Sequence, residues 1–348
     1  MRIAQLAPLW KTVPPEKYGG TEFVISTLTE ALVNEGHDVT LFACGGSKTA
    51  GKLIQVIDRP LFDLLGGFFW DAIPAQEFLL YDELFRRLNE FDIIHNHVGM
   101  HPLVFAKLIR IPTVTTIHSS VAPDFPFFLE RLKDEPIVSI SNAQRKLSPN
   151  LNYVATIYHG INTVDFKPRY EQGEYFLFLG SLTKNKGVDI AVKAAHELNE
   201  RLIIAGSIFG PEDQEFLDRE VMPYVDGDRV KFLGEVDFQT KRELYAKARA
   251  LLFPTQWNEA FGLVMIEALA SGTPVIAYNR GAVSEVITNG VTGFVVETFQ
   301  EFKEGIKKYP ELSRRVCRQE AESRFDAKIM AKNYVELYSK LVGEGSAG

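Results

Sequence analysis

The fold of the second half of this chain is decided by the stretch FPTQWNEAFGLVMIEALASGTPVIA, residues 253–277. Its middle, residues 261–271, is apolar almost throughout and is long enough for a buried helix. The apolar runs on either side, residues 250–253 and 274–277, are short and predict buried strands. A strand, a helix and a strand in this order are typical of a parallel α/β sheet.

Two glutamates make the same stretch informative about function. Glu259 lies just before the predicted helix and Glu267 lies inside it. A carboxylate in so apolar a helix is costly to bury unless it has a partner, and the two adjacent hydroxyls of a ribose would suit Glu267. Glu259 sits where the unpaired N–H groups of a helix collect, and such groups attract phosphate. The stretch therefore predicts contacts to a sugar, a phosphate and a ribose.

Strands and helices alternate outward from this stretch over the whole chain. The predicted strands are 2–7, 38–43, 91–95, 113–117, 137–140, 154–158, 175–179, 202–205 and 230–233, and the predicted helices are 21–35, 77–89, 103–109, 188–199, 211–222, 241–248 and 326–341. This alternation predicts doubly wound parallel sheets. The polar segment 162–175 is interpreted as a linker. The predicted domains are residues 1–163, onto which a C-terminal helix at about 326–343 packs back, and residues 164–325.

Size and composition narrow the class of protein. A chain of 348 residues is long enough for two domains, and its net charge of −7 disfavours a nucleic-acid partner. The two cysteines, Cys44 and Cys317, fit no metal-ligand spacing and suggest no disulfide framework. No signal peptide or apolar run of about 20 residues is recognised, so a cytoplasmic enzyme is expected.

One apolar segment bears on the acceptor and on membranes. Residues 61–74, LFDLLGGFFWDAIP, are rich in Leu, Phe and Trp. They could line an apolar acceptor pocket or touch a membrane surface peripherally. Packing of a loop and a short helix on the core explains them equally well.

Loops that follow strands carry the remaining candidate binding residues, because ligands of parallel sheets bind beyond the carboxyl ends of the strands. Gly19 and Gly20 lie at the start of the first helix, where a ligand can approach the backbone closely, although a simple turn explains them as well. Lys184 and Lys186 follow the strand at 175–179 and could neutralise a diphosphate, or could belong to a solvated basic loop.

Histidines follow two other strands. His118 could donate a hydrogen bond to a substrate hydroxyl or act as a base, or it could be a buried structural histidine. His95, His97 and His101 suggest a metal site, but side chains two residues apart at a strand end are expected to diverge, and no carboxylate lies between them. We therefore expect no metal.

Two motifs resemble binding sites only superficially. Residues 46–52, GSKTAGK, nearly match a P-loop, but Leu53 stands where Ser or Thr would bind magnesium, and no helix follows convincingly. Residues 226–228, DGD, precede a strand and are interpreted as a turn. The absence of GxGxxG argues against a nicotinamide dehydrogenase.

Taken together, the motifs resemble those of one enzyme family over essentially the whole chain. The chain resembles a retaining GT-B glycosyltransferase of glycosyltransferase family 4, the glycogen synthase and sucrose synthase-like group. The matching segments are YGGTE (18–22), DIIHNH (92–97), TTIHSS (115–120), SISNAQ (139–144), IYHGINTVDF (157–166), LGSLTKNKG (179–187), NEAFGLVMIEALASGTPVIAYNRGAVSEVI (258–287) and NGVTGFVV (289–296). The resemblance implies two Rossmann-like domains whose parallel sheets face a central cleft.

The resemblance also implies a role for each candidate residue. An N-terminal domain would bind the acceptor, and a C-terminal domain would bind a nucleotide-diphosphate sugar, with UDP-sugar favoured and GDP-sugar next. Neither a metal nor another cofactor would be required. The implied contacts are Glu259 and His118 to the transferred sugar, the amides of Phe261, Gly262 and Leu263 to sugar and diphosphate, Glu267 to the ribose, Lys186 and Gly20 to the diphosphate, and Glu285 to the support of the site.

The chain departs from the family pattern where a second cation is expected beside the diphosphate. Ser181 replaces the usual arginine, and Lys184 could compensate. The main expectation is a metal-independent hexosyltransferase in which Glu259 positions the sugar and the leaving phosphate takes the acceptor proton. The alternatives are a GT-B nucleotide-sugar epimerase or phosphorylase, and a non-catalytic homologue that binds nucleotide sugar. The acceptor, the hexose and the oligomeric state are left open.

Overall fold

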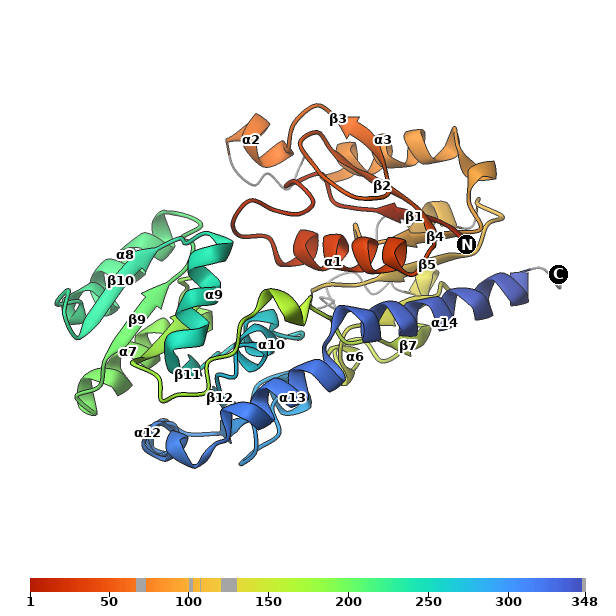
Figure 1. Ribbon diagram of the computed structural model, residues 1–348. Helices are drawn as coiled ribbons and strands as arrows, with labels where there is room; N and C mark the ends of the chain where they lie inside the picture. The colour runs from red at the N-terminus through yellow and green to blue at the C-terminus, as the bar shows by residue number, and fades with distance from the viewer. Residues whose placement is uncertain (67–72, 100–102, 107, 120–129, 346–348) are drawn as a thin grey trace. The chain divides into compact units, whose positions relative to one another are not determined.

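The computed structural model describes residues 1–348 except 67–72, 100–102, 107, 120–129 and 346–348. The described chain forms two compact units (Figure 1), of which the first contains Met1–Gly160 and Ala327–Gly348 and the second contains Ile161–Asp326. The chain therefore passes between the units at two places, 160–161 and 326–327. The polar segment 162–175, interpreted above as a linker, lies inside the second unit.

The first unit is built on a seven-stranded parallel sheet with the strand order β3-β2-β1-β4-β5-β6-β7. The strands are β1 (Arg2–Leu6), β2 (Asp38–Cys44), β3 (Lys52–Ile57), β4 (Ile93–Asn96), β5 (Thr113–Thr116), β6 (Ile137–Ser139) and β7 (Tyr153–Thr156). The order reverses between β1 and β4, because the chain runs outward from β1 on one side and from β4 on the other.

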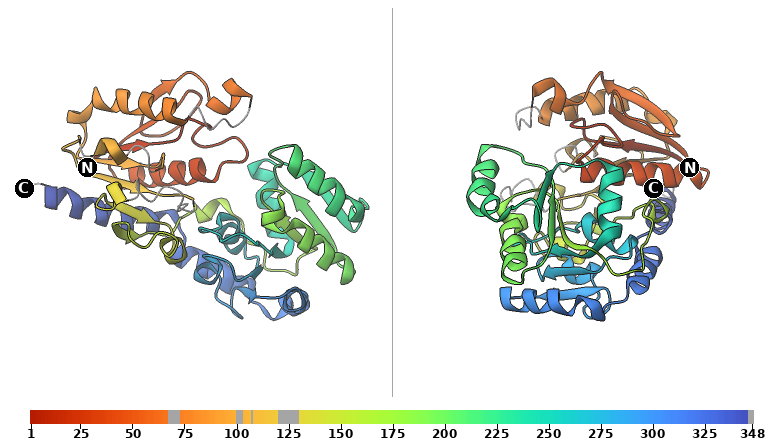
Figure 2. Two further views of the ribbon diagram at one scale, coloured as in Figure 1. Left: turned by 180° about the vertical axis from the view of Figure 1, so that it is seen from behind. Right: turned by 60° about the vertical axis from the view of Figure 1, so that its left-hand side comes forward.

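Helices cover both faces of this sheet. They are α1 (Gly20–Asn34), α2 (Leu61–Leu65), α3 (Ile73–Phe85), α4 (Leu103–Ala106), α6 (Asn142–Arg145) and α14 (Ala327–Gly345). Leu80 and Leu84 of α3 share one apolar cluster with Phe42 of β2, whereas Ile25 of α1 packs with Leu41 of β2. Successive residues of a strand point to opposite faces, so α3 and α1 lie on opposite faces. The C-terminal helix α14 runs along α1 (Figure 2).

The second unit is built on a six-stranded parallel sheet with the strand order β10-β9-β8-β11-β12-β13. The strands are β8 (Tyr175–Leu179), β9 (Leu202–Ala205), β10 (Val230–Gly234), β11 (Ala248–Phe253), β12 (Val275–Tyr278) and β13 (Gly293–Val296). The helices are α7 (Val188–Glu197), α8 (Pro211–Glu220), α9 (Phe238–Lys247), α10 (Leu263–Ala270), α11 (Val283–Val286), α12 (Phe299–Lys308) and α13 (Arg314–Arg324). Buried side chains of α7, α8 and α12 form one core cluster with one face of the sheet, and α9, α10 and α13 pack together on the other.

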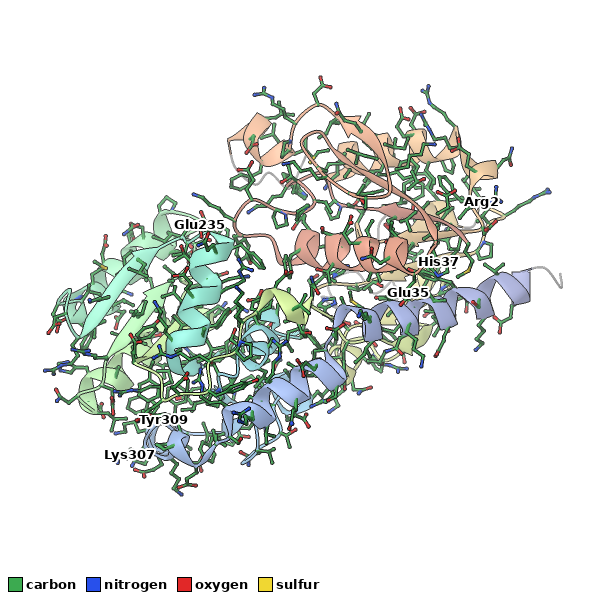
Figure 3. The ribbon with its side chains drawn as sticks, in the orientation of Figure 1. Arg2, Glu35, His37, Glu235, Lys307 and Tyr309 are labelled. Atoms are coloured by element: carbon green, nitrogen blue, oxygen red, sulfur yellow. The ribbon has the colours of Figure 1, made fainter. Side chains whose placement is uncertain are left out.

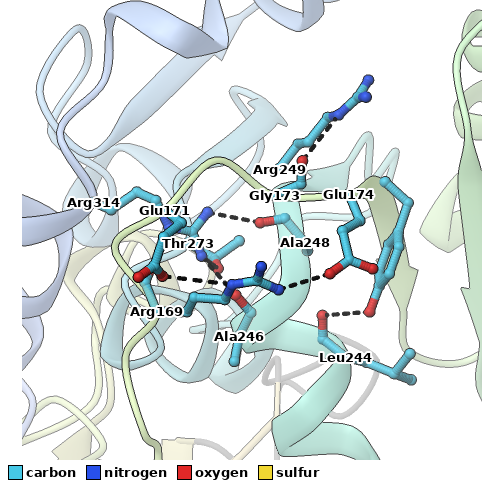
Figure 4. A network of polar contacts seen from close by, with 11 residues as sticks. Arg169, Glu171, Gly173, Glu174, Leu244, Ala246, Ala248, Arg249, Thr273 and Arg314 are labelled. Carbon is cyan, nitrogen blue, oxygen red and sulfur yellow. Dashed lines mark hydrogen bonds and ion pairs between the residues drawn. The ribbon is translucent and has the colours of Figure 1, made fainter.

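A half-buried arginine of α13 ties the beginning of the second unit to its core (Figure 4). The guanidinium of Arg314 donates to the backbone oxygens of Arg169 (2.6 Å), Ala248 (2.7 Å) and Ala246 (2.9 Å) and to Oγ1 of Thr273 (2.9 Å). Burial lowers the pKa of Arg314, but an arginine keeps its charge in proteins. These bonds satisfy carbonyl groups that would otherwise be unpaired in the interior.

A second arginine of the same helix holds the start of the polar segment. The guanidinium of Arg318 donates to the backbone oxygens of Thr163, Phe166 and Ala270 at 2.6–2.8 Å. Its Nε donates to Glu322 one turn later. The segment 162–175 is therefore bonded to α13 from both arginines, and this explains why a polar sequence belongs to a packed unit.

Most of the predicted elements are confirmed to within a few residues. The elements that were not predicted are β3, β13, α2, α6, α11, α12 and α13. β3 and β13 are edge strands whose side chains are mostly half-buried, so neither shows a long apolar run. The helix α12 is rich in charge and reveals its apolar face only through Phe302 and Ile306.

Both superficial motifs have structural roles. The P-loop-like residues 46–52 lead into β3 instead of a helix, which confirms that they form no P-loop. Oδ1 of Asp226 accepts the N–H groups of Asp228, Arg229 and Val230 at 2.8–2.9 Å, which confirms the predicted turn before β10. Residues 67–72 of the apolar segment lie outside the described residues, while Leu64 and Leu65 of α2 are exposed.

Charged side chains mostly lie on the surface. The charged side chains labelled in Figure 3 (Arg2, Glu35, Glu235 and Lys307) are all exposed. Glu22, Glu77, Glu267 and Arg318 are exceptions, because all four are buried. Among the described residues, no helix has the length and the apolar character that crossing a membrane requires.

Candidate functional site

The candidate site of the second unit lies where the strand order reverses. The chain runs from β8 towards β10 on one side and from β11 towards β13 on the other, so β8 and β11 flank the reversal. Parallel sheets bind their ligands beyond the carboxyl ends of the strands at this point. The loop after β8 and the loop after β11 are bonded to each other: the N–H of Gln256 donates to the oxygen of Asn185 (2.8 Å), and Oγ1 of Thr255 donates to the same oxygen (3.3 Å).

These two loops bring Lys186 and Glu259 together. Nζ of Lys186 donates to Oε2 of Glu259 at 2.5 Å, and the two side chains are 28% and 13% exposed. Lys186 ends a single 3-10 turn, Lys184–Lys186, and Glu259 precedes α10. An ammonium has three N–H donors, so Lys186 can hold Glu259 and still bond a second acceptor. The pairing of these two residues was not predicted from the sequence.

A glycine behind Glu259 fixes its backbone. Gly281 follows β12 with φ +60°, and a Cβ there would lie 2.1 Å from the backbone oxygen of Glu259 and 2.4 Å from its nitrogen. The N–H of Ala282 donates to the same oxygen at 2.8 Å. No other residue type fits this approach, so Gly281 is a site residue that sequence reasoning missed. The sequence signal that could have identified Gly281 is its place in the segment 258–287, which resembles the family pattern.

The N-terminus of α10 lies next to Glu259. Gly262 is its N-cap in the left-handed conformation (φ +89°), and among the described residues no side chain caps this end. A Cβ at Gly262 would lie 3.3 Å from Cγ of Glu259. Phe261 and Leu263, the other two predicted amide donors, flank Gly262 directly. A helix end without a side-chain cap carries partial positive charge and suits an anion.

Glu267 is buried in α10 as predicted, but its partners belong to the protein. Oε1 accepts from Nζ of Lys241 at 2.6 Å, and Oε2 accepts from the hydroxyl of Tyr245 at 2.9 Å. α9 therefore supplies two partners for the buried carboxylate, and the contact of Glu267 to a ribose stays a prediction. Burial, and then the charge of Glu267, raise the pKa of Tyr245 well above its usual range, so it remains a donor. Sequence reasoning missed both residues of α9.

The burial or the backbone contacts of the three remaining candidates of the second unit are as follows. Ser181, where the second cation was expected, is buried at the end of β8. Lys184 is exposed, and its carbonyl accepts from Nε2 of Gln256 (3.1 Å). Glu285 lies in α11, and its carbonyl accepts from the guanidinium of Arg324 (2.6 Å). Their proposed side-chain roles stay predictions.

In the first unit, Gly19 has a packing reason to be glycine. Gly19 is the N-cap of α1, and Gly20 begins that helix. A Cβ at Gly19 would lie 2.7 Å from Cβ of Pro15 and 3.0 Å from Oε2 of Glu22. Burial raises the pKa of the Glu22 carboxyl, which lies in the first turn of α1. A close approach of Gly19 to a ligand stays a prediction.

The histidines of the first unit form a buried hydrogen-bonded network. Nδ1 of His97 is 2.9 Å from Nε2 of His118, and Nε2 of His97 is 2.5 Å from Oε1 of Gln5. Nδ1 of His95 is 2.5 Å from the hydroxyl of Tyr338, which belongs to α14. The rings of His95 and His97 lie 3.8 Å apart, so the expectation that they diverge is wrong. Side chains two residues apart on a strand lie on the same face of the sheet.

This network holds its histidines neutral. Burial lowers the pKa of His118 to about 3, and burial followed by the neighbouring histidines lowers the pKa of His95, His97 and His159 well below the usual range. Nε2 of His118 is bonded to His97, and its Nδ1 is buried without a hydrogen-bond partner among the described residues. Nδ1 is therefore the ring nitrogen of His118 that no described residue bonds, and its contact to a substrate stays a prediction.

The metal interpretation of the histidines receives no new support. His101 lies outside the described residues. Among the residues that are described, no group of three or more His, Cys, Asp or Glu side chains is arranged to hold a metal ion.

The comparisons with known proteins agree with these two units. Residues 162–324 match the family described as Glycosyl transferases group 1, and residues 18–163 match Glycosyltransferase Family 4. An uncharacterized glycosyltransferase of Methanocaldococcus jannaschii is 27% identical over 85% of each chain.

Solved structures share the fold over almost the full length. A sucrose-phosphate synthase from Thermosynechococcus elongatus has a TM-score of 0.77 at 20% identity and covers 99% of this chain and 100% of its own. Anabaena HepE, solved in complex with UDP-glucose, has a TM-score of 0.71 at 20% identity and covers 98% of this chain and 100% of its own. The two family matches together run from residue 18 to residue 324, and the chain belongs to the glycosyltransferases of family 4 with the GT-B fold.

Proposed function

We propose that this glycosyltransferase moves a hexose from a nucleotide-diphosphate sugar to an acceptor hydroxyl, with retention of the anomeric configuration and without a metal ion. The observation that carries the proposal is the pair of Lys186 and Glu259 beside the N-terminus of α10, at the strand reversal of the second unit. HepE, which shares the fold, was solved with UDP-glucose, and this supports a UDP-sugar as the first donor to test.

The chemistry follows from where charge develops. Cleavage of the anomeric bond leaves negative charge on the diphosphate, and the ammonium of Lys186 and the N–H groups that begin α10 stabilise it there. Glu259, whose side chain is held by Lys186 and whose backbone oxygen accepts the N–H of Ala282, positions the hydroxyls of the sugar and does not attack it. The leaving phosphate takes the proton of the acceptor hydroxyl, so no dedicated base is needed.

The first unit is proposed to bind the acceptor. The implied contacts of Gly20 and His118 to the donor stay predictions from the family resemblance. The acceptor chemistry is an outcome of screening sugars, lipid-linked sugars and small hydroxylated molecules. A peripheral membrane contact through residues 61–74 also stays a prediction.

A thermal-shift panel of UDP-, GDP- and ADP-sugars tests the donor. A ligand that binds the folded state raises the melting temperature by mass action, and one hundred times Kd contributes about 2.7 kcal/mol. The donor sugar should stabilise the wild type and should stabilise Lys186→Met much less. Lys231→Met, an exposed lysine of β10, serves as the control and should respond like the wild type. No shift with any nucleotide sugar would count against the proposal.

Product analysis then separates the proposed reaction from its alternatives. Retention predicts that the new bond has the anomeric configuration of the donor, as read from the proton coupling constant of the product. EDTA should leave the rate unchanged. An epimerase would convert the nucleotide sugar with no acceptor present, and a phosphorylase would need free phosphate. Binding without turnover over a broad acceptor panel would favour the non-catalytic homologue, the alternative that the buried Ser181 supports.

A further inference from the structure

The carboxylate of Glu267 is the most completely buried ion pair partner of the second unit, since its side chain is 3% exposed. Its two oxygens are held separately, Oε1 by Nζ of Lys241 (2.6 Å) and Oε2 by the hydroxyl of Tyr245 (2.9 Å). Both donors come from α9 and are four residues apart, so one turn of that helix presents both to α10. The carboxylate plane is therefore fixed by two bonds from one rigid element.

The other elements around Glu267 direct their polar groups elsewhere. α10 packs against α9, α13, β11 and β12. On α13, Arg314 and Arg318 bond backbone oxygens, and the thiol of Cys317 contacts the oxygen of Thr292. β11 and β12 contribute the apolar core residues of positions 250–253 and 275–278. The hydrogen bonds to the carboxylate of Glu267 thus come from Lys241 and Tyr245, both on α9.

Counting acceptor sites shows what this arrangement leaves available. An ionised carboxylate has about four lone-pair sites, two on each oxygen. Lys241 and Tyr245 occupy one site on each oxygen, so one site remains on each. Two acceptors side by side in a fixed plane match the two hydroxyl donors of a cis-diol. A protonated carboxyl would lose this match, because one oxygen would then be a donor.

We propose that Lys241 and Tyr245 are positioning residues that hold Glu267 oriented to accept both hydroxyls of a nucleotide ribose. This inference rests on the proposed function. Lys241 supplies the compensating charge, and Tyr245 fixes the rotation of the carboxylate. Without either donor, the carboxylate would lose the orientation that matches the two hydroxyls, and the preference for a ribose would fall.

Binding of a ribonucleotide and of its 2′-deoxy counterpart tests the proposal by calorimetry on the full chain. The probe is whichever of UDP, GDP and ADP stabilises the wild type most, with dUDP, dGDP or dADP as its pair. The quantity compared is the ratio of the two Kd values at pH 6.0 and at pH 8.5. In the wild type we expect a preference for the ribonucleotide of about tenfold or more at both pH values.

Three variants and one control separate positioning from packing. In Lys241→Met the ratio should fall towards one at both pH values, because the donor that orients Oε1 is lost. In Lys241→Arg, which keeps the charge, it should return to the wild-type value at both pH values. In Tyr245→Phe it should fall about tenfold at both. Lys247→Met, an exposed lysine at the end of the same helix, should leave it unchanged.

The outcomes are distinguishable. A lower melting temperature of Lys241→Met with an unchanged, pH-independent ratio would mean that the pair only joins α9 to α10, and would overturn the inference while leaving the proposed function intact. Equal affinity of the wild type for both nucleotides would do the same. Absence of nucleotide binding by the wild type would overturn the proposed function together with the inference. If Lys241→Met does not fold, Tyr245→Phe and Lys241→Arg still distinguish positioning of Glu267 from packing of α9 against α10.

Discussion

The two units bury polar side chains at corresponding places but in opposite electrical states. In the second unit, Glu259 and Glu267 each pair with a lysine beside the reversal of the sheet. In the first unit, the reversal between β1 and β4 is lined by His97 of the loop after β4 and by Gln5 of β1, joined by a neutral hydrogen bond. In the second unit, the carboxylates of Glu259 and Glu267 are paired with lysines, whereas His97 and Gln5 of the first unit form a neutral pair.

The difference indicates which ligands each unit can bind and which changes would disrupt its buried polar groups. An ion pair with spare donors suits a charged ligand such as a diphosphate, because Lys186 keeps N–H groups for it. A neutral network suits hydroxyl groups and is lost when its members are charged. The four predictions that follow test this contrast, from the largest expected effect to the smallest.

Removing the lysine of the charged pair should have the largest effect. Lys186→Met takes away the cation proposed to stabilise the leaving diphosphate and leaves Glu259 unpaired. We expect the transfer rate to fall about 10²–10³-fold, as when one preorganised donor is lost. Initial rates with saturating donor measure it, and Lys231→Met is the control. A rate within about twofold of the wild type would show that the pair is not part of the machinery.

Placing a methyl group behind Glu259 should have the next largest effect. In Gly281→Ala the new Cβ would meet the backbone oxygen of Glu259 at 2.1 Å. We expect the free energy of unfolding to fall by about 2–3 kcal/mol, with weaker donor binding. Gly290→Ala is the matched control, since Gly290 also has positive φ (+74°) but open space around it. It should cost only about 1 kcal/mol, and equal losses would mean that the contact with Glu259 is unimportant.

Acid should destabilise the neutral network. The pKa values of its histidines are lowered in the folded state, so the unfolded state takes up protons first, and stability is lost as the pH falls below about 6.5. For His118, whose pKa is about 3, the loss continues to about that pH. Each such histidine contributes about 1.4 kcal/mol per pH unit at most.

Urea unfolding of the first unit at pH 7.5 and 5.5 measures this dependence. His97→Gln cannot take up a proton and should reduce the stability lost between pH 7.5 and 5.5 by about 1.4 kcal/mol. His196→Gln, at an exposed histidine of α7, is the control and should leave the slope unchanged. A slope equal in all three proteins would show that the network does not control acid stability.

Uncapping α9 should have the smallest effect. Oδ1 of Asp237 accepts the N–H of Thr240 at the start of the helix that carries Lys241 and Tyr245. Asp237→Ala should cost about 1 kcal/mol of stability and weaken donor binding slightly. Thr298→Ala removes the capping box of α12, a helix that does not contact Glu267, and should cost stability alone. Melting curves with and without donor compare the two, and equal donor responses would contradict a role for the alignment of α9.

Much of the fold could be predicted because its signals are local. A buried parallel strand is a short apolar run, and the apolar residues of a helix recur with the helical period. The alternation of strands and helices in residues 175–278 can therefore be predicted directly from the sequence. The same local logic placed Lys186 and Glu259 after strands. It missed β3 and β13, whose side chains are half-buried at the sheet edges.

The partners of the buried polar groups could not be predicted, because they are remote in the sequence. Gln5 meets His97 across 92 positions, and Lys241 meets Glu267 across 26. Glu267 has its partners on α9, a different helix from its own. No local pattern distinguishes Lys241 from the other exposed-looking lysines of a polar helix such as α9.

The sequence by itself determined the class of the fold, the family and the residues that follow each strand, because periodicity and strand-end position are properties of neighbouring residues. Only the tertiary structure decided which side chains compensate one another: that Lys186 holds Glu259, that Lys241 and Tyr245 hold Glu267, and that the histidines stay neutral. The physical reason is that strand order and helix packing bring these groups together, and the cost of burying a polar group depends on what it meets there.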